Sequence, residues 1–216
     1  MKVDTTGGTA FSGFAASVDQ YKSVHVSGGF ERGEIPAGTT SLKVDIQYSA
    51  DGKTGWTTRK SFGVPTQAGT NAKAAIQESM PYPGAPGYVR LRYGATPGIH
   101  GSVTPAVRVE RTMTAIPEFN ATPEPARKGA PITITGKLTH RTPDWKPFAG
   151  QRIDYYYRPA GSTVWKQMGT STTAADGTFK KSFTATRTGS WYARYEHQDG
   201  LHFVAASGVD EVVVTP

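Results

Sequence analysis

Apolar and polar residues alternate in short segments along the chain, and turn residues separate these segments. The alternation covers residues 24–26, 44–48, 89–93, 107–109, 132–135 and 153–157. A period of two places every second side chain on one face, which is the pattern of half-buried β-strands. Asp-Gly pairs at 51–52, 176–177 and 199–200 are typical of tight turns between antiparallel strands. Only residues 71–79 have a composition that suits a helix, so the pattern predicts an all-β chain.

The two halves of the chain repeat the same arrangement of residues. The matches are Asp45, Tyr48 and Trp56 with Asp154, Tyr157 and Trp165, and residues 87–93 with residues 189–195. Each half is near the roughly 100 residues of a seven-stranded sandwich. The sequence therefore predicts two tandem antiparallel β-sandwich domains, which cover residues 1–114 and 115–216.

The second half carries a set of segments that points to a known type of repeat. These segments are residues 119–129, 136–139, 145–148 and 157–159, Trp165, and residues 176–179. Together they resemble the immunoglobulin-like β-sandwich repeats of secreted actinobacterial proteins, typified by Streptomyces. The first half resembles the same repeats through the internal match. The resemblance implies a secreted or cell-surface chain with two immunoglobulin-like domains, and it supplies no catalytic residue.

Charge and composition exclude several classes of partner. The formal net charge is +7, but the excess is divided almost evenly between the halves, and no basic run exceeds two residues. A nucleic-acid site would gather these charges on one element, so we expect no nucleic-acid partner. Weak attraction to acidic cell-wall polysaccharide stays open. The chain has no cysteine and no apolar stretch near the roughly 18 residues of a membrane span.

Motifs of catalytic chemistry are missing from the sequence. It contains no G-x-S-x-G, H-E-x-x-H or G-x-G-x-x-G pattern. His197 and His202 lie five residues apart, which suits neither one face of a strand nor one face of a helix. Asp210 and Glu211 are adjacent on a predicted strand and therefore point to opposite faces. We expect no enzyme activity, no cofactor and no metal site. Met1 to Asp4 lack the apolar core of an export signal, so we expect the sequence to be a mature region.

Three classes of function remain open on this basis. The first is a non-catalytic extracellular module that binds a protein, mediates adhesion or acts as a spacer. The second is a module that binds carbohydrate or cell wall, because aromatic faces stack on sugar rings. The third is a protein inhibitor of a secreted enzyme that acts through a protruding loop.

The alternation also predicts which strand residues face outward. Asp45 and Asp154 are expected to form cross-strand ion pairs with Arg92 or Arg90 and with Arg194. Tyr156 and Tyr192 also point outward, so with Trp145 they are the aromatic candidates for stacking on a sugar.

Loop positions give two further groups of candidates. In an immunoglobulin-like domain, the loops at 30–37 and 94–101 lie at the end where the chain enters. The candidate partner-binding residues at this free tip are Phe30, Arg32, Ile35, Ile99 and His100. The equivalent end of the second domain carries Trp145, Phe148 and His197. These are expected to pack at the interdomain junction or, alternatively, to bind a ligand.

Overall fold

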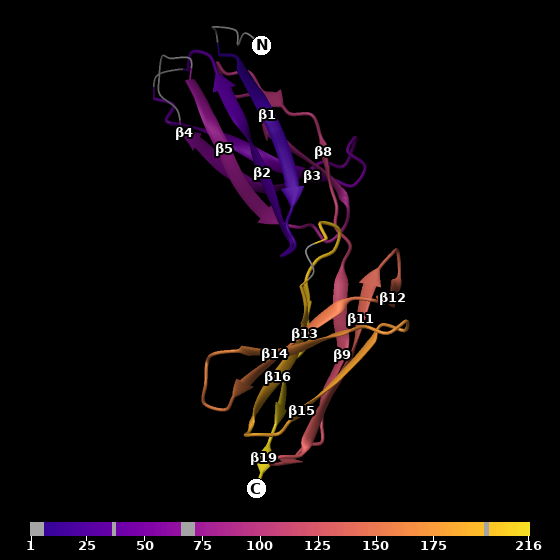
Figure 1. Cartoon of the computed structure of the whole chain (residues 1–216). Coiled ribbons are helices and arrows are strands. Elements are labelled where there is room, and N and C mark those ends of the chain that lie inside the picture. The colour runs from indigo at the N-terminus through magenta and orange to yellow at the C-terminus, as the bar shows by residue number, and fades with distance from the viewer. Residues whose placement is uncertain (1–6, 36–37, 66–71, 197–198) are drawn as a thin grey trace. The chain divides into compact units, whose positions relative to one another are not determined.

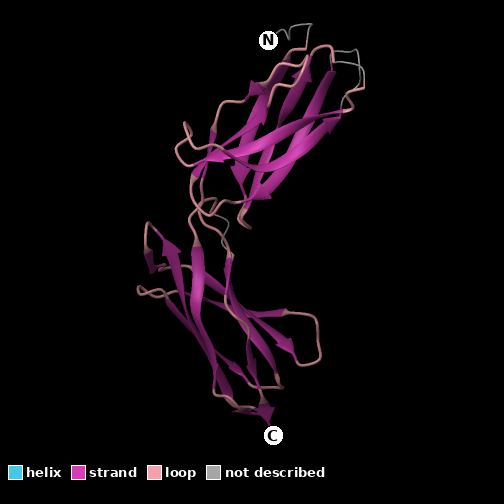
Figure 2. Ribbon diagram, turned by 180° about the vertical axis from the view of Figure 1, so that it is seen from behind, coloured by secondary structure: helices cyan, strands magenta, loops and turns pink. Residues whose placement is uncertain are grey.

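The computed structural model describes residues 7–35, 38–65, 72–196 and 199–216 (Figure 1). Within these residues the regular secondary structure is entirely strand, as Figure 2 shows. The all-β prediction is confirmed. Two compact units divide the chain, Met1–Arg111 and Thr112–Pro216. This division lies close to the predicted domain boundary between residues 114 and 115.

The first unit is a sandwich of two antiparallel sheets. One sheet has the order β1 (Thr9–Val18), β2 (Ser23–Arg32), β5 (Ala72–Pro81). The other has the order β4 (Thr57–Pro65), β3 (Ser41–Ser49), β6 (Gly87–Tyr93), and β7 (Ser102–Val103) and β8 (Val107–Val109) both pair with β6. The rings of Phe30 and Tyr93 meet between the sheets with centroids 5.7 Å apart. This contact joins β2 of one layer to β6 of the other.

The second unit has the same kind of strand order. β11 (Pro131–Arg141) pairs with β9 (Thr114–Thr122), β12 (Trp145–Pro147) and β15 (Thr178–Thr184). The facing sheet has the order β14 (Lys166–Thr172), β13 (Arg152–Pro159), β16 (Gly189–Tyr195), with β17 (Ala205–Ala206) and β18 (Asp210–Val212) both paired with β16. A short parallel pair, β10 (Ala126–Arg127) with β19 (Val214–Thr215), ends this unit.

The connections between the sheets identify the fold. In each unit the second long strand, β2 or β11, is central in the smaller sheet. The third and fourth long strands lie in the facing sheet, and the fifth, β5 or β15, returns to pair with the second. This alternation between two sheets is the arrangement of immunoglobulin-like sandwiches. The predicted fold class is therefore confirmed.

Burial follows the predicted alternation for the inward residues of the central strands, but Gln47 and Asp154, which the alternation places on the outer face, are also buried. The residues expected to face inward are all buried, namely Val44, Ile46, Tyr48, Val89, Leu91 and Tyr93 in the first unit, and Ile153, Tyr155, Tyr157, Trp191, Ala193 and Tyr195 in the second. The described part of the segment that suits a helix by composition, residues 72–79, lies in β5, where ten residues pair with β2. Ladder hydrogen bonds and the buried side chains of Ile76 and Met80 outweigh the local preference there.

One tyrosine–glycine contact occurs in both units. In the second unit the Tyr157 hydroxyl donates to the carbonyl of Arg187, with an O···O distance of 2.7 Å. A Cβ atom placed on Gly189 would lie 2.6 Å from the Tyr157 ring and 2.5 Å from the Arg158 carbonyl. In the first unit Tyr48 covers Gly87 in the same way, with 2.4 Å to the ring. Only glycine fits beneath the tyrosine at the start of this strand.

We therefore expect Gly189→Ala to destabilise the second unit by about 1–3 kcal/mol, because the added methyl group overpacks the contact with Tyr157. Gly208→Ala is the control, because a Cβ there meets no atom within 4 Å. Both changes are made in a Trp56→Phe background, in which the remaining tryptophans all lie in the second unit. Urea unfolding followed by tryptophan fluorescence then reports that unit. Equal unfolding midpoints for the two alanine variants would contradict the packing argument.

Candidate functional site

The outer face of the β14–β13–β16 sheet in the second unit carries a cluster of rings. Tyr156 on β13 and Tyr192 on β16 are opposite each other in register, and their rings stack with centroids 4.8 Å apart and an angle of 8°. The Trp165 ring meets Tyr192 edge to face at 4.6 Å, and the Arg158 guanidinium lies 4.7 Å from the Trp165 ring centroid. All four side chains are partly exposed. We call Tyr156, Arg158, Trp165 and Tyr192 the aromatic face.

Polar side chains adjoin the aromatic face along the same strands. Arg152 donates to Asp154 Oδ1 from Nη2 at 2.8 Å, and Gln167 Nε2 donates to the same oxygen at 2.6 Å. Arg194 pairs with Glu196 at 3.0 Å. Arg152, Asp154, Tyr156, Gln167 and Glu196 line a depression of about 290 Å³. We call this depression the polar pocket.

The two tyrosines of the aromatic face keep their protons at neutral pH. Burial raises the pKa of Tyr156, and the nearby Asp154 carboxylate raises it further. Burial also raises the pKa of Tyr192. Both hydroxyl groups are therefore available as hydrogen-bond donors to a ligand.

The predicted cross-strand ion pairs are wrong, although the residues lie where the alternation placed them. Asp154 is opposite Arg194 in register. Its carboxylate binds Arg152, two residues away on the same face of the strand, and Arg194 binds Glu196 by the same spacing. In the first unit, Asp45 is opposite Arg92 but accepts a hydrogen bond from Ser61 at 2.6 Å.

The equivalent face of the first unit has different chemistry at the paired positions. Gln47 on β3 and Arg90 on β6 are opposite each other in register, and Arg90 Nε donates to Gln47 Oε1 at 3.0 Å. The Arg90 guanidinium lies 3.9 Å from the Trp56 ring centroid. In both units a tryptophan contacts the member of the pair that lies on β6 or β16: Trp56 contacts Arg90, and Trp165 contacts Tyr192. The tyrosine pair itself belongs to the second unit.

The candidate tip of the first unit is mostly interior. β2 continues to Arg32, so the loop begins later than residue 30. Phe30 is fully buried, and its ring lies 4.9 Å from that of Phe11. Arg32, Ile35 and Ile99 are also buried, whereas His100 is exposed. Of the five candidates, His100 has the accessibility that a contact residue needs.

The structure describes two of the three candidates at the other loop end. Trp145 lies on the edge strand β12 with 49% of its surface exposed. Phe148 is partly buried, and His197 lies outside the described residues. The role of these three residues at an interdomain junction stays a prediction.

Phe148 belongs to a histidine cluster that spacing along the chain did not indicate. The His140 ring stacks on Phe148 with centroids 4.3 Å apart, and the His202 ring lies 4.5 Å from Phe148. His202 Nδ1 pairs with Asp199. Burial lowers the pKa of His140, and His202 lowers it further. Burial, with help from Asp199, raises the pKa of Tyr195, whose ring contacts Phe148, to about 12.

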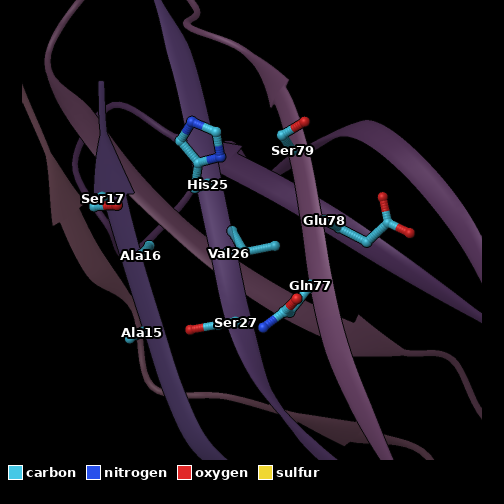
Figure 3. Close-up of a pocket in the computed structure, with 9 residues that line it drawn as sticks. All are labelled: Ala15, Ala16, Ser17, His25, Val26, Ser27, Gln77, Glu78 and Ser79. Carbon is cyan, nitrogen blue, oxygen red and sulfur yellow. The ribbon is translucent and has the colours of Figure 1, made fainter. Parts of the chain in front are cut away.

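A second depression, of about 450 Å³, lies on the outer face of the β1–β2–β5 sheet (Figure 3). Small side chains, including Ala15, Ser17 and Ser27, form much of its surface. His25 at one end pairs with Asp19 at 2.9 Å. Its charged side chains are already paired, His25 with Asp19 and Glu78 with Lys60, so we assign no site to it.

Among the residues that the structure describes, no three His, Asp or Glu side chains are grouped to hold a metal ion. The described part also contains no helix long and apolar enough to span a membrane.

Comparison with known proteins gives structural similarities of low score. No family model and no curated protein sequence matches the chain. The D0-D1 domain of intimin matches over 94% of this chain and 98% of its own, at 14% identity and a TM-score of 0.33. The human OSCAR ligand-binding domain matches over 92% and 96%, at 13% identity and a TM-score of 0.30. Red sea bream transglutaminase matches over 100% of this chain and 32% of its own, at 16% identity and 0.30. At these scores the similarities indicate neither a family nor a function.

The histidine cluster predicts a loss of stability in acid. Because the folded-state pKa of His140 lies below its ordinary value of 6.5, the unfolded chain binds more protons below that pH. The free energy of unfolding of the second unit should therefore fall as the pH drops from about 7.5 to 5. His140→Phe keeps a ring against Phe148 but cannot titrate, so its loss should be smaller. Urea unfolding in the Trp56→Phe background measures both, and identical acid losses would exclude His140 as the cause.

Proposed function

We propose that the chain is a non-catalytic binding module of a secreted or cell-surface protein. In this proposal the aromatic face and the polar pocket of the second unit form the ligand-binding surface. The observation that carries the proposal is the contiguous group of partly exposed rings beside hydrogen-bonding side chains. Aromatic side chains supply large contact areas to partners, and Tyr and Trp keep one polar group for orientation. The resemblance of the second half to secreted actinobacterial repeats supports the extracellular setting.

The first unit supports a role for the tyrosine pair beyond folding. The equivalent positions of the first unit hold Gln47 on β3 and Arg90 on β6, and their side chains are hydrogen-bonded to each other. The sandwich therefore forms without aromatic residues at these positions. Because packing does not demand Tyr156 and Tyr192, ligand contact is the better explanation of their presence.

A protein partner is the second candidate, and one observation favours it. Val164 is 70% exposed and Met168 is 40% exposed, and both lie close in sequence to Trp165. Exposed apolar side chains beside aromatic rings are typical of the core of protein interfaces. A binding surface that included them would extend from the sheet face to the β14 edge.

The test exchanges the paired residues between the units. The double variant Y156Q/Y192R gives the second unit the pair that the first unit already carries, so we expect it to fold. Binding to purified Gram-positive cell walls that retain their proteins is measured by sedimentation. We expect the amount bound at subsaturating concentration to fall about tenfold, equivalent to about 1.4 kcal/mol.

The reciprocal variant Q47Y/R90Y is the matched control, because it changes the same positions in the first unit. It should bind at least as well as the original chain. Urea unfolding confirms that both variants are folded. Equal binding by Y156Q/Y192R and the original chain, or no binding of the original chain to these walls, would contradict the proposed function.

A further inference from the structure

We infer that the ligand of the aromatic face is a neutral oligosaccharide that lies along β13, an inference that rests on the proposed function. The sugar rings would contact Tyr192 and Trp165, and the sugar hydroxyl groups would form hydrogen bonds in the polar pocket. The inference depends on the juxtaposition of flat rings with side chains that both donate and accept hydrogen bonds.

The shape and chemistry of the surface suit a sugar ring. A pyranose has apolar C–H faces and a rim of hydroxyl groups, so it needs a flat apolar partner and polar groups beside it. Trp165 and Tyr192 meet at an angle of 89°, which gives the face two differently oriented rings. The polar pocket of about 290 Å³ adjoins Tyr156 on the same strands. Tyr156 stacks on Tyr192 and Arg158 lies over Trp165, so the sugar would contact the parts of these rings that stay exposed and bond in the pocket beside them.

Hydrogen-bonding capacity remains in the polar pocket. All hydrogen bonds that the described residues give to Asp154 go to Oδ1, from Arg152 and Gln167. Asp154 Oδ2 is left to accept a bond from a ligand hydroxyl group. Gln167 uses its Nε2 in this contact, which leaves Oε1 as a second acceptor. These oxygens suit the donor groups of a polyol.

The charges of the polar pocket favour a neutral sugar over an acidic one, and the cationic Arg158 of the aromatic face lies over the Trp165 ring outside this pocket. Arg152 is paired with Asp154 at 2.8 Å, and Arg194 is paired with Glu196 at 3.0 Å. An anionic ligand in the pocket would approach two carboxylates and find these two guanidinium groups already engaged. Binding should therefore depend little on ionic strength, since it does not require release of opposite charges.

The length of the face favours a chain of sugars over a single ring. Asp154, Tyr156 and Arg158 occupy alternate positions on β13, so they share its outer face. At about 3.3 Å per residue, this row is about 13 Å long. Affinity should therefore rise with the number of sugar units until the row is filled.

Isothermal titration calorimetry tests the inference with β-1,4-linked hexasaccharides of glucose, mannose, xylose and N-acetylglucosamine, with polygalacturonate as the anionic comparison. At least one neutral hexasaccharide should bind, and raising NaCl from about 0.05 to 0.5 M should change its Kd less than about threefold. Y156Q/Y192R and Trp165→Ala should each weaken binding about tenfold or more. Trp56→Ala, the matched change in the first unit, should leave it unchanged. Failure of all four neutral probes, salt-sensitive binding of polygalacturonate alone, or equal binding by the variants would overturn the inference.

Treated cell walls separate this inference from the proposed function. Periodate cleaves the vicinal diols of 1,4-linked glucose, mannose and xylose, chitinase cleaves 1,4-linked N-acetylglucosamine, and protease removes wall protein. Loss of face-dependent binding after periodate or chitinase, with retention after protease, supports the oligosaccharide. The opposite pattern would overturn the oligosaccharide and leave a protein-binding module. If the original chain does not bind to untreated walls, the proposed function itself is contradicted.

Discussion

Each sandwich depends on the pairing of two central strands, β3 with β6 or β13 with β16. A tyrosine that packs over a glycine fixes this pairing. Tyr48 covers Gly87 in the first unit, and Tyr157 covers Gly189 in the second. Both tyrosine hydroxyls donate to backbone carbonyls of the loop that precedes the sixth strand. The contact therefore joins the two central strands of the larger sheet and also holds the loop between the sheets. Because the ring fills the space of a side chain, no larger residue replaces the glycine.

This pairing determines which residues are free to carry function. Once one set of side chains on these strands lies in the core, the alternate set must face outward. The outward positions have no packing partner in the facing sheet, so their chemistry is free to differ between the units. Gln47 and Arg90 bond to each other in the first unit, whereas Tyr156 and Tyr192 stack in the second. One architecture thus carries a glutamine–arginine pair at these positions in one unit and a tyrosine pair in the other.

Local pattern predicts the sandwich well because packing against the facing sheet imposes a period of two on the inward residues of the central strands. The inward residues of the central strands, such as Ile46 and Tyr155, could be identified in this way. The contacts that the outward side chains make could not be identified from the alternation. Asp154 lies opposite Arg194 in register, which predicted an ion pair between them. The flexible side chain of Arg152, two residues away on the same strand, binds the Asp154 carboxylate instead.

Candidate site residues were harder to predict where they depend on loop paths. The sequence predicted that Phe30 begins a loop, but β2 continues through this residue, and its ring packs in the core against Phe11. The contact of His140 with His202 joins residues far apart in sequence, so no spacing rule indicates it. Tyr156 and Tyr192 could be found from the sequence because strand alternation alone places both on the outer face.

The central claim is that the outer face of the β14–β13–β16 sheet binds the ligand of this chain. The most direct measurement is a two-dimensional amide NMR titration of the isotope-labelled full chain with oligosaccharides released from the same cell walls. Shift changes should cluster on β13, β14 and β16, with the largest near Tyr156, Gln167 and Tyr192. Shift changes confined to the loops around His100 or Trp145, with those three strands unaffected, would contradict it.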